Sequence, residues 1–198
     1  MDFKSSQTMC NLARAFAGES QARTRYAIYA KTAEKENYPN LAQVFTYTAS
    51  QELAHAEVFL NNLIGHGGGA PSIDIHAGYP FELGNTLDNL RFAMDGENDE
   101  STTIYPSFAQ TAREEGFEDI ARLFDLIAKI EARHAARYEG LFARLNQNSL
   151  YSSSFPTAWV CQNCGNVITA EKPWVVCPVC GKEQGYIEML QCAPELRP

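Results

Sequence analysis

The chain has 198 residues, of which 45% are hydrophobic and 20% are charged, and this composition excludes a disordered or fibrous protein. Sixteen basic residues against 24 acidic ones give a net charge of −8, which argues against binding to the phosphates of nucleic acids. No apolar run is long enough to span a membrane, and the first residues lack the apolar core of a secretory signal. We therefore expect a cytoplasmic protein that binds neither membranes nor nucleic acid.

Hydrophobic residues recur at helical spacing from residue 6 to residue 146, in four segments. Short breaks at residues 37–39 and at Gly116 join the first segment to the second and the third to the fourth, which predicts two antiparallel helical hairpins. The long connection at residues 66–81 is rich in glycine and proline and can cross the length of a bundle. These features predict a mainly α protein with a ferritin-like four-helix bundle.

Two details of the helices can be compared with a structure. The third hydrophobic stripe runs from Leu83 to Phe108, and Pro106 within it predicts a kink. The first stripe includes Phe16 and Arg23, so both side chains are expected to face the core.

Charged residues interrupt the apolar stripes on faces that must be buried, where charged side chains are rare unless they have a partner. Two of the helices carry a Glu-x-x-His pair, which places a carboxylate and an imidazole on one helix face. Two such helices opposite two glutamate-bearing helices are typical of ferritin-like dimetal sites. The candidate metal ligands are Glu19, Glu52, His55, Glu97, Glu100, Glu131 and His134.

These ligands also lie at matching depths in the predicted bundle. Glu19 and Glu52 are about 27 and 22 Å from the first turn, and Glu97 and Glu131 are about 28 and 22 Å from the second. Five buried glutamates need cations, because several ionised carboxylates cannot share an apolar site. Oxygen-rich ligands with two imidazoles suit iron or manganese, although affinity alone does not exclude zinc.

The sequence around these residues resembles the rubrerythrin family over nearly the whole chain. AFAGESQAR at residues 15–23 is similar to the family's first ligand helix, and YPSFA at 105–109 with AREEG at 112–116 is similar to its third. The resemblance implies a di-iron centre in which Glu52 and Glu131 bridge the two irons.

The resemblance also implies the remaining ligands. Glu19 and Glu100 would be terminal ligands of one iron. Glu97 and His134 would be ligands of the other. His55 would replace Glu100 when the centre is reduced.

Four residues are candidates for a direct part in the reaction. Glu97 or Glu100 could relay protons to a bound substrate. Tyr26 and Tyr105 match family tyrosines that hydrogen-bond to ligand carboxylates, and plain packing is the alternative for both.

Four of the six cysteines form two Cys-x-x-Cys units with 12 residues between them, each followed by glycine. Four thiolates at this spacing predict a tetrahedral metal site. The spacing leaves zinc and iron open, whereas the resemblance to a rubredoxin-like domain favours iron. The ligands are Cys161, Cys164, Cys177 and Cys180, while Cys10 and Cys192 are expected to be structural or free thiols.

The serine-rich stretch at residues 147–156 predicts a linker between two domains. Residues 1–146 would form the di-iron bundle and residues 157–198 the rubredoxin-like iron domain. The second unit is too small for a large core, so the metal would stabilise it. Its aromatic core is expected to contain Trp159, Trp174 and Tyr186.

A one-electron iron beside a two-iron carboxylate site predicts redox chemistry. The leading hypothesis is a peroxidase that reduces hydrogen peroxide to water in protection against oxidative stress. A rubredoxin or an NAD(P)H-dependent reductase would supply the electrons through the tetrathiolate iron. The alternatives are a ferroxidase or iron-handling protein, a dioxygen-reducing variant, and a non-enzymatic module with a structural zinc ribbon.

The tail begins roughly 20 Å beyond His134 along the fourth helix. The family resemblance implies a head-to-tail homodimer, or a higher oligomer. In it, the tetrathiolate iron of one subunit would lie near the di-iron centre of the other.

Overall fold

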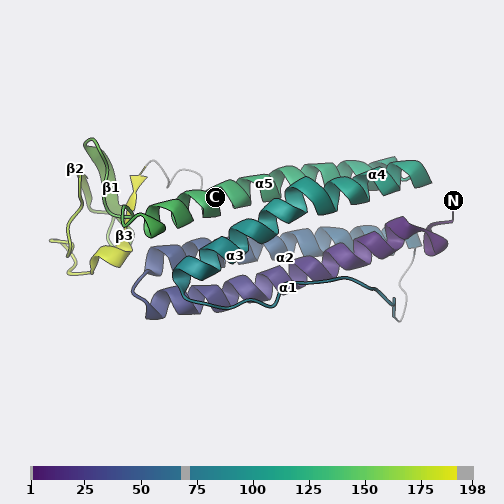
Figure 1. Ribbon diagram of the computed structural model, residues 1–198, viewed down its shortest axis with the longest axis horizontal. Helices are drawn as coiled ribbons and strands as arrows, with labels where there is room; N and C mark the ends of the chain where they lie inside the picture. The colour runs from purple at the N-terminus through teal and green to yellow at the C-terminus, as the bar shows by residue number, and fades with distance from the viewer. Residues whose placement is uncertain (1, 68–71, 191–198) are drawn as a thin grey trace.

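The computed structural model describes residues 2–67 and 72–190. Long helices form an elongated bundle, with a small sheet at one end and the N-terminus at the other (Figure 1). The α-helices are α1 (Gln7–Lys35), α2 (Pro39–Gly67), α3 (Thr86–Asp99), α4 (Tyr105–Glu115) and α5 (Glu118–Asn146). The short elements are η1 (Phe3–Ser5), η2 (Glu100–Ile104), β1 (Thr157–Cys161), β2 (Val167–Ala170), η3 (Gln184–Tyr186) and β3 (Ile187–Met189).

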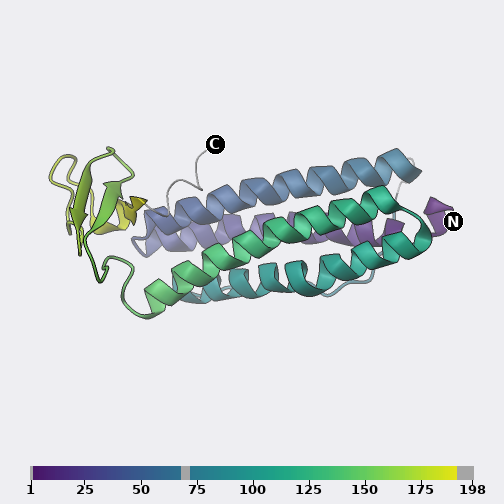
Figure 2. The same ribbon diagram turned by 90° about the horizontal axis from the view of Figure 1, so that it is seen from above.

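The helices pair as two hairpins, α1 with α2 and the α3–η2–α4 rod with α5, as the sequence predicts (Figure 2). The Ser6 hydroxyl accepts a hydrogen bond from the Met9 N–H, which caps the start of α1. Gly116 ends α4 in the left-handed conformation at φ 88°, which a glycine adopts without a steric cost. None of the helices in the described ranges is long and apolar enough to cross a membrane.

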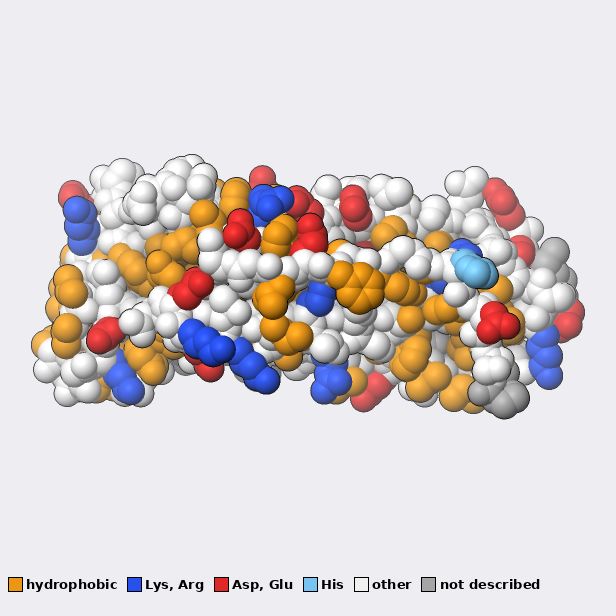
Figure 3. Space-filling model, turned by 60° about the horizontal axis from the view of Figure 1, so that its bottom comes forward, with side chains coloured by type: hydrophobic (Ala, Val, Ile, Leu, Met, Phe, Trp, Pro, Cys, Tyr) orange, Lys and Arg blue, Asp and Glu red, His pale blue; other side chains and the backbone are white. Residues whose placement is uncertain are grey.

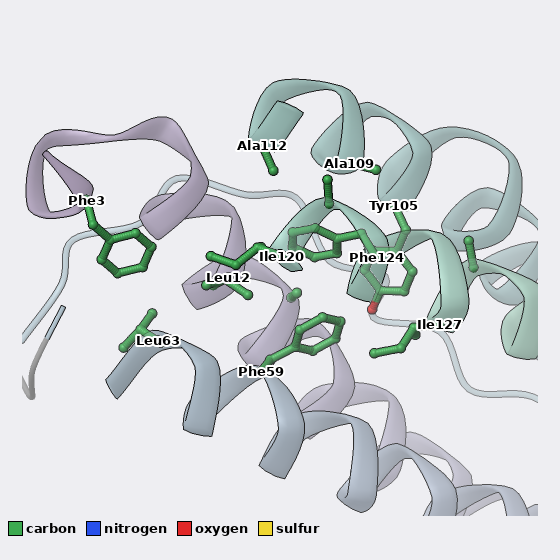
Figure 4. Close-up of a cluster of buried hydrophobic side chains, with 13 residues drawn as sticks. Phe3, Leu12, Phe59, Leu63, Tyr105, Ala109, Ala112, Ile120, Phe124 and Ile127 are labelled. Carbon is green, nitrogen blue, oxygen red and sulfur yellow. The ribbon is translucent and has the colours of Figure 1, made fainter. Parts of the chain in front are cut away.

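Two apolar clusters fill the bundle on either side of a polar middle. The first lies toward the N-terminal end and contains Leu12, Phe59 and Phe124 (Figure 4). The second lies toward the sheet and contains Phe45 and Tyr138 with other aromatic side chains. Burying each large apolar side chain stabilises the fold by about 1.5–3 kcal/mol, so the two clusters hold the helices that present the polar residues between them.

Several expectations for the helix faces are wrong. Leu83 is 64% exposed and precedes α3, because Asn85 caps that helix and starts it at Thr86. Phe16 is 36% exposed and Arg23 is exposed, since the buried face of α1 passes through Leu12, Glu19 and Tyr26 instead.

The crossover connection is shifted relative to the prediction of residues 66–81. Helix α2 continues to Gly67, so His66 is helical, and its Nε2 lies 2.8 Å from Asp119 Oδ2 at the start of α5. Residues 72–85 then follow α1 without regular structure until α3 begins. This described part of the crossover, residues 72–85, is called the strap below.

The third predicted helix is interrupted differently from a simple proline kink. A π-helical turn, η2, joins α3 to α4, and Pro106 is the second residue of α4. The Tyr105 N–H donates to the Glu100 carbonyl, which is the five-residue spacing of a π-turn. Pro106 has no N–H of its own, so it fits the first turn of the helix that follows.

The C-terminal region forms a three-stranded antiparallel sheet in the order β2-β1-β3. Trp159 is fully buried in it, whereas Trp174 and Tyr186 are only half-buried, so the expected core of three aromatic side chains is reduced to one. A Cβ atom at Gly185 would lie 2.1 Å from the Asn37 carbonyl oxygen, so this region packs directly on the α1–α2 turn. The described connection before it is fastened by Arg144, which donates to the carbonyls of Ser149, Leu150 and Ser152.

Candidate metal centres

Six of the seven candidate ligands meet in the polar middle of the bundle. Two groups of ligand atoms each lie within 4.8 Å of one another. One group is Glu19, Glu52, His55 and Glu131, and the other is Glu52, Glu97, Glu131 and His134. Glu52 and Glu131 belong to both groups, so their carboxylates lie between two adjacent positions for metal ions.

The two histidines place one nitrogen in each group. His55 Nδ1 lies 2.9 Å from Glu131 Oε1 and 3.8 Å from Glu19 Oε2. His134 Nδ1 lies 2.8 Å from Glu131 Oε2 and 3.4 Å from Glu97 Oε2. The two imidazole rings stack at 6.0 Å between centroids, so both nitrogens face the same small volume.

The donor set fits metal ions because buried atoms in it lack other partners. Within the described residues, one oxygen each of Glu19, Glu52 and Glu97 and both oxygens of Glu131 have only the histidine nitrogens of the cluster as ion-pair partners within 4 Å and make no hydrogen bond of good geometry. His134 Nδ1 also lacks one. Leaving one such group unpaired costs about 1–3 kcal/mol, and a cation between them would satisfy all of them. The carboxylate–histidine cluster therefore suits a di-iron centre.

The electrostatics of the cluster favour the binding of cations. Burial raises the pKa of Glu19 to about 7, against the lowering effect of His55. Burial raises the pKa of Glu97 to about 7 in the same way, against the effect of His134. Burial alone would lower the pKa of His134, but the carboxylates of Glu131, Glu52 and Glu97 outweigh it and raise the pKa to about 12.

Glu100 differs from the other candidate ligands. It is half-buried in η2 and lies outside both groups of atoms, whereas His55 takes a place beside Glu19. Burial, with the negative charges of Glu19 and Glu97, raises the pKa of Glu100 well above its usual range.

Both candidate tyrosines donate hydrogen bonds to carboxylates of the cluster. The Tyr26 hydroxyl donates to Glu97 Oε1 at 2.6 Å, and the Tyr105 hydroxyl donates to Glu19 Oε1 at 2.5 Å. Burial first, and the neighbouring carboxylates second, raise the pKa of both phenols well above the ordinary value. Both tyrosines therefore remain donors, which orients one oxygen of each carboxylate and leaves the other for a metal.

Gln51 is a member of the site that the sequence pattern did not indicate. Its side-chain oxygen lies 3.1 Å from His134 Nε2. An amide oxygen only accepts hydrogen bonds, so Nε2 keeps its hydrogen, and Nδ1 is the nitrogen that would release its proton and bind a metal. Gln51 directly precedes Glu52 on a partly exposed face, and no spacing signal distinguishes it from an ordinary surface glutamine.

The four paired cysteines form the second candidate centre. Their sulfur atoms lie within 4.8 Å of one another, with Cys161 and Cys180 Sγ 3.7 Å apart and Cys164 and Cys177 Sγ 3.7 Å apart. Gly165 and Gly181 follow the two units at φ 75° and 71°, the left-handed region that glycine favours. The arrangement suits a rubredoxin-like tetrathiolate iron.

Backbone N–H groups adjust the acidity of these thiols. Burial raises the pKa of Cys177, but the backbone N–H groups of Cys180 and Val179 and the neighbouring thiols outweigh it and lower the pKa to about 6. A thiolate is the form that binds a metal. Cys10 is a half-buried free thiol on α1, and Cys192 lies outside the described residues.

Comparisons with known proteins agree with this architecture. A family model for rubrerythrin matches residues 11–142. The chain is 46% identical to a rubrerythrin of Porphyromonas gingivalis over 189 residues, covering 95% of this chain and 92% of that protein. It is 37% identical to a rubrerythrin of Nitratidesulfovibrio vulgaris over 188 residues, covering 94% of this chain and 96% of that protein.

Solved structures show the same fold. Nigerythrin in a partially reduced state superposes with a TM-score of 0.63 at 25% identity, covering 92% of this chain and 86% of that one. A bacterioferritin of Desulfovibrio desulfuricans gives a TM-score of 0.64 at 23% identity, covering 72% of this chain and 82% of that one. The ferritin-like bundle, the carboxylate–histidine cluster and the four-cysteine sheet thus occur together in one chain, and that chain belongs to the rubrerythrin family.

Proposed function

We propose that the protein is a di-iron peroxidase that reduces hydrogen peroxide to two molecules of water in protection against oxidative stress. The observation that carries the proposal is the presence, in one chain, of a buried centre for two metal ions and a tetrathiolate centre. The first suits a two-electron reaction and the second suits the delivery of single electrons. Family membership supports the coarser statement that the protein is an oxidoreductase.

The ligand assignment follows the two groups of atoms. Glu52 and Glu131, which belong to both groups, would bridge the irons. Glu97 and His134 would complete the coordination of one iron. Glu19 would bind the other together with His55, which shares its group of atoms, and Glu100 would take the place of His55 in the oxidised state.

Two ferrous ions held there would supply the two electrons that break the O–O bond. The balance is H2O2 plus two electrons and two protons giving two H2O. Glu97 or Glu100 would pass protons to the departing oxygen, because burial favours the protonated form of both carboxyls. Tyr26 and Tyr105 would hold Glu97 and Glu19 in place by their hydrogen bonds.

The electron donor is proposed to be a rubredoxin or an NAD(P)H-dependent reductase acting through the tetrathiolate iron. A homodimer, or a higher oligomer, would bring that iron to the di-iron centre of a second subunit. We also propose a cytoplasmic location, since metal-binding cysteine pairs persist as thiolates in a reducing compartment.

Anaerobic stopped-flow spectroscopy tests the proposal. Fully reduced protein is mixed with hydrogen peroxide, and the visible colour of the ferric tetrathiolate centre is followed. We expect the colour to return rapidly, and much more slowly in Glu52→Ala, which loses a ligand shared by both metal positions. Leu53→Ala, a partly exposed neighbour on the same helix, is the matched control and should behave like the unmodified protein.

Two outcomes contradict the proposal. A coloured protein that responds slowly to peroxide but rapidly to dioxygen or to added ferrous iron would favour dioxygen reduction or iron handling. A fully occupied cysteine site without thiolate–iron colour would mean zinc, and the electron-relay role would fail.

A further inference from the structure

A cavity of about 440 Å³ lies between α1, the α3–η2–α4 rod and the strap. The strap covers it and is pinned to α1 by side-chain hydrogen bonds. The Tyr79 hydroxyl donates to the Arg14 carbonyl at 3.0 Å, the Tyr29 hydroxyl donates to the Glu82 carbonyl at 2.7 Å, and Gln21 Nε2 donates to the Pro80 carbonyl. On the face seen in Figure 3, hydrophobic side chains are interspersed with side chains of both charges.

The cavity reaches the candidate di-iron centre. Glu100 and Tyr105 both line it, and Tyr105 hydrogen-bonds to Glu19 within the centre. Gly18 lies between the strap and Glu100, because a Cβ atom at this position would lie 3.6 Å from Tyr79 Cε1 and 3.9 Å from Glu100 Oε1. The cavity is therefore connected to the ligands and does not belong to a separate part of the surface.

The cavity is larger than hydrogen peroxide requires. A water molecule takes about 30 Å³ of liquid, and hydrogen peroxide on the order of twice that. Pockets of about 300–1,000 Å³ are typical of sites for small organic ligands. About 440 Å³ lies within that range, so a molecule with an organic group fits.

The lining matches a neutral molecule with one apolar and one polar end. Phe92, Ile104 and Phe108 contribute apolar surface. Arg14 and Arg25 also line the cavity, and their guanidinium groups are hydrogen-bond donors. A guanidinium at the cavity can donate to a peroxide oxygen, while the aromatic and aliphatic walls would contact a hydrocarbon substituent.

We propose that this cavity admits organic hydroperoxides, so that the protein reduces them as well as hydrogen peroxide. The proposal rests on the proposed peroxidase function. The O–O bond of ROOH would break with the uptake of two electrons and two protons, giving ROH and H2O. The electrons would come from the same NAD(P)H-linked donor chain, and the protons from solvent.

Cumene hydroperoxide is the test substrate, and two variants place a larger side chain in the lining of the cavity. A Cβ atom at Gly96 has only Arg25 Nη2 nearby, at 4.0 Å, and a Cβ atom at Gly78 meets nothing within 4 Å, so Gly96→Leu and Gly78→Leu extend into open space. The matched control is Gly65→Leu, a helical position away from the cavity with nothing within 4 Å. We expect kcat/KM for cumene hydroperoxide to fall at least about tenfold in the two cavity variants, while the value for hydrogen peroxide changes less than about twofold.

Binding of 2-phenyl-2-propanol, the unreactive alcohol product, gives a readout independent of turnover. Saturation-transfer NMR with oxidised, metal-loaded protein should detect its binding in the unmodified protein and in Gly65→Leu, and its loss in Gly96→Leu and Gly78→Leu. Retained metal content in every variant shows that the di-iron centre is intact.

Each adverse outcome is distinct. Reduction of hydrogen peroxide without reduction of cumene hydroperoxide overturns this inference and leaves the proposed function standing. Equal reduction of cumene hydroperoxide by unmodified protein and both cavity variants shows that the cavity is not the binding site. Reduction of neither peroxide by metal-loaded protein overturns the proposed function and this inference together.

Discussion

Glu19 and Glu97 determine how the metal-free protein responds to pH. Their pKa values rise from 4.5 to about 7 on folding, so the folded state holds protons that the unfolded chain has released. That contribution to stability is complete below pH 4.5 and is lost as the pH rises through about 7. The pKa of His134 rises from 6.5 to about 12, so its contribution also declines above pH 6.5.

We therefore expect the metal-free protein to lose stability from pH 5 to pH 8, by on the order of 5 kcal/mol for the two carboxyls together. Urea unfolding of chelator-treated protein at several pH values measures this slope. The double variant Glu19→Gln, Glu97→Gln should flatten it, because neither amide titrates. Metal-loaded protein should not share the slope, since metal binding requires the carboxylates to be ionised. A slope of opposite sign in the metal-free protein would contradict the assignment.

Tyr26 and Tyr105 provide a second prediction at this scale. Tyr26→Phe and Tyr105→Phe each remove one hydroxyl that donates to a ligand carboxylate. We expect metal affinity, measured by competition with a chelator, to fall about 10–100-fold in each. Tyr29→Phe is the control: it also removes a buried hydroxyl, but one that donates to the Glu82 carbonyl in the strap. Equal loss of affinity in all three variants would mean that the tyrosines act only through packing.

The candidate ligands were predictable because charge at buried helix positions is rare and the Glu-x-x-His spacing is specific. Gln51 was not predictable, because its role arises from the approach of His134 on a different helix. The position of His55 beside Glu19, with Glu100 outside the group, also required the three-dimensional arrangement.

At the scale of elements, η2 is the feature that the sequence only partly indicated. Pro106 marks a break, but nothing in the local sequence distinguishes a π-turn from a kink. An ideal α-helix would direct Glu100 and Tyr105 about 140° apart, at about 100° per residue. The five-residue π-turn, closed by the hydrogen bond from the Tyr105 N–H to the Glu100 carbonyl, reduces this angle, and both residues line the cavity. Such turns are rare and are frequent at functional sites.

The π-turn predicts that two single-residue deletions in this rod differ in their effect on stability. Deleting Thr103, an exposed residue of η2, in a Pro106→Ala background converts the turn to a regular α-turn without a proline in the helix interior, and keeps Glu97 and Tyr105 on the inner face. We expect its Tm to remain within a few degrees and its peroxide reaction to slow, because Glu100 shifts. Deleting Asp95, exposed in regular α3, rotates buried Leu90 away from the core and should cost about 2–5 kcal/mol. Thermal unfolding separates the two; a Thr103 deletion as destabilising as the Asp95 deletion would contradict this role of η2.

At the scale of the whole molecule, the two centres of one chain are far apart. The four-cysteine region packs on the α1–α2 turn at Asn37, where only a glycine at residue 185 avoids a clash. Glu52 lies 13 residues beyond Pro39 along α2, which is about 20 Å at 1.5 Å per residue. This docking was not visible in the sequence, because the contact is made by backbone atoms. Electron transfer slows steeply with distance, so this separation supports the proposal that electrons pass between subunits.

Transfer between subunits can be tested with mixed dimers. One chain carries Glu52→Ala, which disables its di-iron centre, and the other carries Cys161→Ala, which disables its tetrathiolate centre. Co-expression with two different affinity tags isolates the mixed species. In a head-to-tail dimer, the intact tail of the first chain lies at the intact bundle of the second, so about half of the unmodified activity per dimer should return, because one of two symmetric junctions is complete.

Each homodimeric variant alone should be inactive with a rubredoxin or an NAD(P)H-dependent reductase as electron donor. The activity of the mixed dimer is compared with these two inactive homodimers. A second pairing, with both substitutions in one chain and an unmodified partner, is the control. Transfer within a chain leaves the unmodified partner fully functional, whereas transfer between subunits separates its intact tail from its intact bundle. Activity in the control together with no activity in the mixed dimer would show that electrons pass within one chain. We expect the opposite result, which is activity in the mixed dimer and no activity in the control. Gly185 packs on the α1–α2 turn, and this contact holds each tail at the end of its own bundle, away from the metal ligands of the same chain.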